Sequence, residues 1–413
     1  MKSGDREIEV TAKRPRITRL VVFIASITLL VQAGFAATIG TRPLTPRAKS
    51  RGIHETPHAR RHMRHLARSR VVKSRTVSSL KRHHYYEHFY ASSYAKDITD
   101  GDVTAGEDPV VRQAAIDALG NMNGTVLAIE PTSGRVLAMV NQKLALSSGA
   151  QPCSTIKLSV ALAALSEGII TKETEVRLGG RSHMNLTLAL AHSNNAYFEA
   201  LGRQLGFEKV AHYAHSYGLG ELAGYHIEGE QAGVYPEEEI SAKLGGVGKM
   251  CSFGEGISMT PLQLGSLVTA IANGGTMYYL QHPTTAAEVA GFQPMVKRHL
   301  DIAGMIPEIS DGMAGAVEYG TARRLLVNFN EEEVLGKTGT CSRAGTRFGW
   351  FASYANTNYG RVVVVVFLEG GRPTFGPKAA EIAGHMYRNL YDHDFFAQKP
   401  IAPVQVRKTS SSD

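Results

Sequence analysis

Five consecutive valines, Val362–Val366, constrain the fold more than any other feature of this 413-residue chain. A strand points alternate side chains to opposite faces, so a run that is apolar at every position must be buried on both faces. Two further strand-like runs precede it, at residues 335–341 and 349–355. We therefore expect a sheet that is covered by a packed layer on each face.

Two shorter strand-like runs, residues 124–130 and 135–140, flank a turn of Pro, Thr, Ser and Gly and predict a hairpin. Between them and the later strands the chain is largely helical, with an Ala/Leu-rich segment at 158–165 and a longer one at 186–205. Apolar residues at helical spacing over 379–390 predict a closing helix. The fold class is therefore α+β, with about five antiparallel strands from both ends of the folded region and an all-helical subdomain between them.

The positive charge of the chain is concentrated in one segment. The whole sequence has a net charge of +8, but residues 41–84 hold 13 Lys or Arg against the single carboxylate of Glu55. Residues 1–40 carry a net charge of +3, which leaves −7 for residues 85–413. The basic segment is rich in Pro, His and Arg, and we expect a solvated linker there that touches anionic lipid or wall polymer. Nucleic acid is not expected as a partner of an exported chain.

A charge-free apolar run, residues 20–41, follows a basic N-terminal stretch. Its length suits a single membrane-spanning helix, which is the interpretation we favour. The alternative is a secretory signal cleaved after Ala36, because small residues occupy Gly34 and Ala36. The basic residues that follow the run oppose the charge rule for this orientation, yet both alternatives export the rest of the chain.

These features divide the chain into five expected regions. They are a cytoplasmic N-terminus (1–19), the transmembrane anchor or signal segment (20–41), a basic linker (42–107), one folded domain (108–398) and a tail (399–413).

Three short polar motifs occur in order along the folded domain. They are Ser154-Thr155-Ile156-Lys157, Ser193-Asn194-Asn195 and Lys337-Thr338-Gly339-Thr340. A Ser-x-x-Lys is expected about once or twice by chance in a chain of this length, and Ser78 to Lys81 forms a decoy in the basic linker. The order of the motifs and their surroundings therefore carry the argument.

The surroundings suit nucleophilic catalysis. Ser154 follows Pro152 and opens the Ala/Leu-rich helix, where backbone N–H groups can hold an oxyanion. Lys157 lies one turn along on the same face, and in an apolar site its amine can take the serine proton. The second motif interrupts a helical stretch, as expected where polar side chains face a cleft. Lys337 and its neighbouring hydroxyls offer a place for a carboxylate, and Gly339 leaves room for substrate backbone.

On these motifs the chain resembles the transpeptidase domain of penicillin-binding proteins, within the penicillin-binding protein and serine β-lactamase superfamily. The resemblance extends over residues 108–395. It includes the opening hairpin, the stretch from Gly254 to Gln263, the segment Glu318-Tyr319-Gly320-Thr321-Ala322 and Trp350-Phe351.

The resemblance implies a role for each motif residue in peptidoglycan D,D-transpeptidation on D-Ala-D-Ala stem peptides, with covalent binding of β-lactams. Ser154 would be the nucleophile, Lys157 its base, Ser193 a proton relay and Asn195 a substrate ligand. Lys337 would tune the electrostatics, while Thr338 and Thr340 bind the terminal carboxylate beside Gly339. No metal or cofactor is implied. The expected location is the bacterial inner membrane, with the catalytic domain in the periplasm or, after signal cleavage, secreted.

Three other functions remain open from the sequence. A D,D-carboxypeptidase would use the same residues with water as acceptor. A serine β-lactamase needs a group that activates water, and the candidates Glu228 and Glu230 lie in a Gly-containing turn. A non-enzymatic β-lactam sensor would need a cytoplasmic effector, and residues 1–19 resemble none.

The cysteines adjoin two of the motifs. Cys153 precedes Ser154, Cys341 follows Thr340, and Cys251 stands apart. Some carbapenem-hydrolysing class A β-lactamases bridge the equivalent neighbours, so the resemblance implies a Cys153–Cys341 disulfide with Cys251 free. The alternative is three buried thiols that act as small apolar residues.

Overall fold

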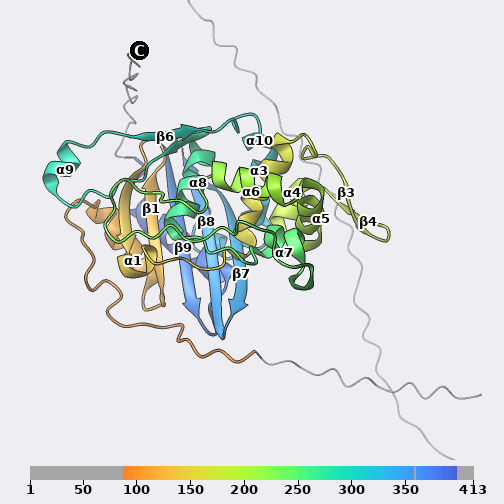
Figure 1. The fold of residues 1–413 in the computed structure, drawn as a ribbon. Coiled ribbons are helices and arrows are strands. Elements are labelled where there is room, and N and C mark those ends of the chain that lie inside the picture. Colours follow the sequence, from red (N-terminus) through yellow and green to blue (C-terminus); the bar gives the residue numbers. More distant parts are fainter. Residues whose placement is uncertain (1–86, 358–359, 398–413) are drawn as a thin grey trace, which may run out of the picture. The chain divides into compact units, whose positions relative to one another are not determined.

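The structure is a computed structural model that describes residues 87–357 and 360–397. Its largest sheet has five antiparallel strands in the order β2-β1-β9-β8-β7. The first hairpin supplies two of them and the C-terminal part supplies the other three, which confirms the predicted sheet (Figure 1). The strands are β1 (Gly124–Glu130), β2 (Arg135–Val140), β7 (Glu333–Arg343), β8 (Thr346–Thr357) and β9 (Gly360–Gly370).

The valine run lies at the centre of this sheet and is buried on both faces, as its composition requires. On β9, Val363 and Val365 point into the core shared with the inserted helices. Val362, Val364 and Val366 point into a second core on the opposite face. Helices α1 (Pro109–Leu119) and α11 (Gly376–Asp392) close that second core. The sheet therefore has the two covering layers that the valines predicted.

Helix α8 (Pro261–Asn273) fixes the inserted subdomain to the sheet. It begins with a capping box in which Thr260 accepts from the Gln263 backbone and Gln263 accepts in return. Gly265 allows the close approach, since a Cβ there would lie 2.7 Å from the Cδ1 of Ile129. The first core thus runs continuously from the sheet into the helices that carry the first two motifs.

The insert is not all-helical, which corrects the prediction. Two small antiparallel sheets lie within it, β3 (Val176–Gly179) with β4 (Ser182–Met184) and β5 (Thr276–Tyr278) with β6 (Val296–His299). The first is a short, largely exposed hairpin that turns at Gly179 and Gly180, and it extends away from the helices in Figure 1. Runs of three or four residues give too little periodicity to be identified from sequence.

The remaining elements complete the insert. The helices are α2 (Gln142–Ala145), α3 (Lys157–Ser166), α4 (Leu186–Ala191), α5 (Asn195–Leu205), α6 (Phe207–Ser216), α7 (Gly246–Phe253), α9 (Ala286–Ala290) and α10 (Ile306–Glu318), with the 3₁₀ turns η1 (Cys153–Ile156), η2 (Ala242–Leu244) and η3 (Leu325–Val327).

The predicted linker, residues 42–107, ends too late in the sequence, because its last part belongs to the folded domain. Residues 87–107 pack against it, with Ser93 buried and its hydroxyl accepting from the Gly371 backbone at 3.0 Å. The polar composition of this stretch suggested a solvated linker. Several of its polar groups, on Ser93, Asp102 and Glu107, are instead bound by partners in the folded domain.

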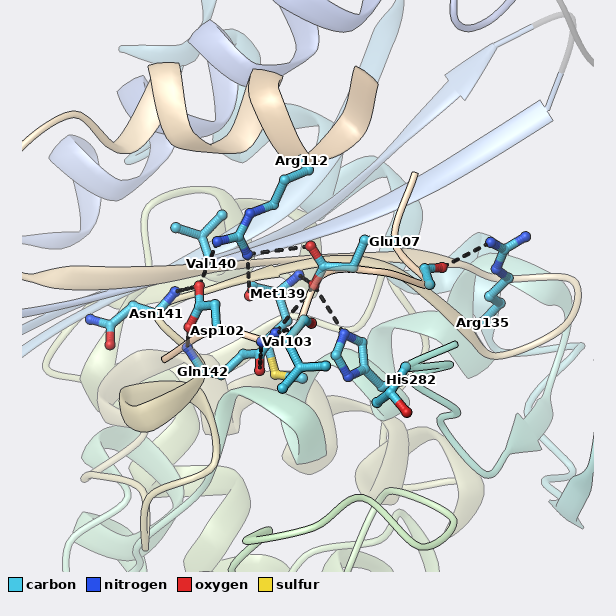
Figure 2. A network of polar contacts seen from close by, with 12 residues as sticks. Asp102, Val103, Glu107, Arg112, Arg135, Met139, Val140, Asn141, Gln142 and His282 are labelled. Carbon is cyan, nitrogen blue, oxygen red and sulfur yellow. Dashed lines mark hydrogen bonds and ion pairs between the residues drawn. The ribbon is translucent and has the colours of Figure 1, made fainter. Parts of the chain in front are cut away.

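A buried ionic network secures the last part of this stretch (Figure 2). The Arg112 guanidinium lies 2.6 Å from the Asp102 carboxylate and 3.3 Å from that of Glu107. Glu107 also accepts from the Met139 backbone at 2.8 Å and lies 2.9 Å from the His282 ring nitrogen. Because these groups are almost fully buried, they compensate one another's lost hydration and join α1, β2 and the loop after β5.

The predictions for residues 1–86 and 399–413, including the anchor or signal segment, lie outside the described residues. Across residues 87–357 and 360–397, no helix combines the length and the apolar character that spanning a membrane requires.

Candidate active site

The predicted nucleophile lies in a tight turn just before a buried helix. Ser154 is the second residue of η1, and α3 begins at Lys157, so the serine precedes the α-helix instead of opening it. Cys153 has a φ of 53°, a left-handed conformation that is costly for a residue with a side chain. Ser154 keeps 8% of its surface exposed. The backbone therefore holds this serine at the surface of an otherwise buried turn.

Lys157 joins the first motif to the second. Its ammonium nitrogen lies 3.0 Å from Ser154 Oγ and 3.1 Å from Ser193 Oγ. It also donates to the Ser193 carbonyl at 2.8 Å and to Asn195 Oδ1 at 2.7 Å. The side chain is fully buried. Lys157 is thus within proton-transfer distance of two hydroxyls.

The second motif forms the break between α4 and α5. Ser193 has a φ of 55°, the second left-handed residue of the site, and this turn points its hydroxyl at the two lysines. Asn194 caps α5 by accepting from the Tyr197 backbone at 2.9 Å. Asn195 then begins the helix. The break predicted from the polar run is therefore present, and the middle residue has a structural role.

Lys337 approaches Ser193 from the sheet. It lies on β7, and its ammonium donates to Ser193 Oγ at 2.9 Å and to the Thr338 carbonyl at 3.0 Å. Lys337 is also fully buried. The three motifs, far apart in sequence, therefore meet at a single serine hydroxyl.

Both lysines of the site have lowered pKa values because they are buried. Burial, together with the neighbouring charge of Lys337, lowers the pKa of Lys157 to about 6, and Glu199 acts in the opposite direction. Burial also lowers the pKa of Lys337 to about 7. Because desolvation disfavours the ammonium form, a neutral Lys157 that accepts the Ser154 proton is accessible near neutral pH.

The threonines of the third motif face the N-terminus of α11. Thr340 Oγ1 accepts from the Gly376 backbone at 2.8 Å, and Thr338 Oγ1 lies 2.6 Å from Thr321 Oγ1. Gly339 faces the other way, and a Cβ there would lie 2.9 Å from the Pro152 carbonyl oxygen. From the sequence we expected Gly339 to leave room for substrate backbone. The structure instead requires glycine because β7 passes so close to the nucleophile's turn.

A disulfide joins that turn to β7. Cys153 and Cys341 are bonded to each other with their Cα atoms 5.5 Å apart, and Cys251 is free and buried. The two cysteines are the sequence neighbours of Ser154 and Thr340. The bond therefore ties the helix side of the site to the strand side.

Three residues that contribute to the site were not predicted from the sequence. The Gln151 carbonyl accepts from the Trp350 indole at 3.0 Å, and its side chain reaches Glu255 at 3.1 Å, which braces the nucleophile's turn. Thr321 and Gly376 position the threonines of β7. Thr321 belongs to a segment that the resemblance included, whereas no sequence signal marked Gln151 or Gly376.

The described part of the chain shows no group of three or more His, Cys, Asp or Glu residues arranged to hold a metal ion. The site is composed of hydroxyl, amine and amide groups. Such a set can carry out proton transfer and nucleophilic attack.

Comparison with known proteins places this geometry in a family. Residues 124–391 match the penicillin-binding protein transpeptidase domain. Stage V sporulation protein D of Bacillus subtilis is 27% identical over 64% of this chain and 48% of its own length. The peptidoglycan D,D-transpeptidase MrdA of Acinetobacter baumannii is 24% identical over 75% of this chain and 56% of its own length. The chain thus spans about half the length of these curated relatives.

Solved structures share the fold. Penicillin-binding protein 2 of Pseudomonas aeruginosa, in complex with WCK 5153, matches with a TM-score of 0.58 and 22% identity over 70% of this chain and 74% of its own. A peptidoglycan glycosyltransferase from Burkholderia ambifaria matches with a TM-score of 0.59 and 20% identity over 73% of this chain and its entire length. With the family match covering most of the folded region, this chain belongs to the penicillin-binding protein transpeptidase family.

Proposed function

We propose that this chain is a serine-type peptidoglycan D,D-transpeptidase that forms an acyl-enzyme on stem peptides ending in D-Ala-D-Ala and is acylated by β-lactams. One observation carries the proposal: Ser154, Lys157, Ser193 and Lys337 form a continuous chain of contacts between 2.9 and 3.1 Å. The MrdA relatives are named peptidoglycan D,D-transpeptidases, which supports the same reaction and substrate class.

In the acylation step, Ser154 Oγ attacks the carbonyl carbon of the penultimate D-Ala, and neutral Lys157 takes the hydroxyl proton. A new O–C bond forms, and the C–N bond to the terminal D-Ala breaks. The proton passes through Ser193, which contacts both lysines, to the departing amine. Free D-Ala leaves, and the rest of the stem remains as an ester on Ser154.

The second step reverses the chemistry with a new amine. The acceptor amine attacks the ester carbonyl and forms the cross-linking C–N bond while the C–Oγ bond to Ser154 breaks. The proton that the amine loses passes through Lys157 to Ser154 Oγ, which regenerates the free hydroxyl. We infer that the backbone N–H groups of Ser154 and Thr340 hold the oxyanion in both steps. The disulfide between their neighbours keeps these two segments together.

The remaining motif residues bind substrate in this proposal. The Oδ1 of Asn195 accepts a hydrogen bond from Lys157, so its amide nitrogen can donate to a substrate carbonyl. Thr338 and Thr340 receive the terminal carboxylate. Their hydroxyls are already oriented by Thr321 and Gly376, so they need little reorganisation when substrate binds.

We also propose that residues 20–41 anchor the chain in the inner membrane, with the catalytic domain in the periplasm. This location is where stem peptides occur. The charge-free run and the function support it, and cleavage of the run would instead release the domain to the periplasm.

Labelling with a fluorescent penicillin tests the proposal. The purified chain should bind the label covalently, and Ser154→Ala should abolish binding, whereas Ser78→Ala, in the decoy motif, should bind normally. Labelling that persists in Ser154→Ala contradicts the assignment.

A second assay separates the alternatives. A stem pentapeptide incubated with an acceptor amine should yield the amide product, whereas a D,D-carboxypeptidase gives only hydrolysis. Rapid multiple turnover of a chromogenic cephalosporin would identify a β-lactamase. Labelling without turnover of any peptide would favour a sensor.

A further inference from the structure

The helix that Lys157 contacts, α5, also carries one partner of an ion pair, Glu199. Asn195 Oδ1 receives the Lys157 ammonium at 2.7 Å, and the Phe198 ring lies 5.5 Å from the same nitrogen. Lys157 therefore contacts one face of α5. Glu199 is one helical turn after Asn195 on that face, because residues four apart are neighbours on a helix surface.

The Glu199 carboxylate is held by two cations. Lys249 of α7 lies 3.0 Å from it, and Arg203 of α5 lies 3.5 Å from it. The Lys249 ammonium also lies over the Phe253 ring at 4.5 Å. Gly202 of α5 allows α7 to approach, since a Cβ there would lie 2.8 Å from the Cβ of Cys251. The Glu199 side chain is 23% exposed, so solvent screens this pair only in part.

The charges around Lys157 come from two directions. The two charged residues that act on it electrostatically are Lys337, on β7, and Glu199, on α5. The groups that it directly contacts, on Ser154, Ser193 and Asn195, are uncharged. Within the described residues no carboxylate is recorded in hydrogen-bonding contact with either lysine. Glu199 raises the pKa of Lys157, whereas burial and Lys337 lower it.

We propose that Glu199 and Lys249 are positioning residues that act through Lys157, with opposite electrostatic effects on its readiness to take the Ser154 proton. The inference rests on the proposed function, in which Lys157 is the base. Glu199 favours the charged lysine and Lys249 weakens that influence by pairing with Glu199. The balance between them sets the pH at which Lys157 becomes neutral.

The ion pair makes a matched test possible, since either partner can be removed separately. Glu199→Gln keeps the shape and removes the negative charge. Lys249→Met keeps the stem over Phe253 and removes the positive charge. If the pair only held α5 to α7, both variants would break the same contact and act alike. If it tunes Lys157, they must shift its protonation in opposite directions.

The measurement is the second-order rate of acylation by a penicillin against pH. The acylation rate should rise with pH as Lys157 becomes neutral. This rising part of the pH–rate profile should move to lower pH in Glu199→Gln and to higher pH in Lys249→Met, each by about half a pH unit to one unit. On the low-pH side a half-unit shift corresponds to about a threefold change in rate. Because Lys157 and Lys337 interact, the apparent pKa of this rising part describes the two lysines together.

Glu167→Gln is the matched control. Glu167 pairs with Lys209 at 2.5 Å and directly follows α3, whose ten residues begin at Lys157 and span about 15 Å. Its profile should match that of the wild type. Shifts in the same direction for Glu199→Gln and Lys249→Met, or no shift in either, would overturn the inference. Labelling that survives Ser154→Ala would instead refute the proposed function, so the two failures are distinguishable.

Discussion

Lys157 and Lys337 share one hydrogen-bonding partner, with their ammonium nitrogens 3.1 and 2.9 Å from the Ser193 hydroxyl. Both are fully buried, and each disfavours a second positive charge nearby. The arrangement favours one neutral and one charged lysine. A neutral Lys157 beside Ser154 and a charged Lys337 beside the carboxylate-binding threonines is the division of roles that fits the proposed reaction.

Replacing each lysine by arginine should separate these roles. Lys157→Arg should lower acylation by about 10²–10⁴-fold, because a guanidinium stays protonated and cannot act as a base. Lys337→Arg should keep part of the acylation rate, because the charge is preserved. The measurement is the rate of covalent labelling by a fluorescent penicillin, with thermal unfolding as a check on folding. Wild-type activity in Lys157→Arg would exclude the base role.

The buried Lys337 should make stability depend on pH. Its pKa is lowered to about 7 from an ordinary 10.5, so between these values the unfolded chain holds a proton that the folded chain has released. The free energy of unfolding then increases with pH by at most about 1.4 kcal/mol per pH unit from this group. Lys337→Met should remove that slope, so its Tm relative to wild type should be higher at pH 7 than at pH 9. Parallel Tm curves would contradict this.

Reducing the disulfide should lower both stability and acylation. The bond joins residues 188 apart, and the chain-entropy model gives an upper limit of about 5 kcal/mol for such a loop. A reducing agent should lower the Tm and slow acylation of the wild type but leave a Cys153→Ala, Cys341→Ala double variant unchanged. Mass spectrometry of the non-reduced protein should show one free thiol, at Cys251. Three free thiols would refute the bond.

For the ionic network in Figure 2, we expect a large effect on stability when its arginine is removed. Arg112→Met leaves the buried carboxylates of Asp102 and Glu107 without their guanidinium, which should cost about 3–5 kcal/mol of unfolding free energy. Arg388→Met removes a partly exposed arginine that pairs with Glu331 and Asp392, and should cost about 1 kcal/mol or less. Denaturant unfolding measures both. Equal losses of unfolding free energy in the two variants would show that the buried network contributes no more to stability than the partly exposed ion pairs of Arg388.

The strands of the main sheet could be predicted because their signal is local. The valine run and the first hairpin have the composition of buried strands, and β1 and β2 begin and end at the predicted residues. The two small sheets and the packing of residues 87–107 could not be predicted. The strands of the small sheets are too short to give a periodic signal, and residues 87–107 are held by partners distant in sequence, such as the carboxylate of Glu107 with the ring of His282.

For the candidate active site, the sequence identified the motif residues, because the three motifs carry the hydroxyl, amine and amide groups that the proposed chemistry needs, but it did not mark Gln151 or Gly376. The tertiary structure decided what these groups do to one another. Only folding places Ser193 between the two lysines and buries them, and burial is the largest cause of their lowered pKa values, since desolvation arises from surrounding side chains that no motif contains. In the same way Glu199 and Lys249 have no motif, and their influence on Lys157 exists only because α5 and α7 pack together beside the nucleophile's helix.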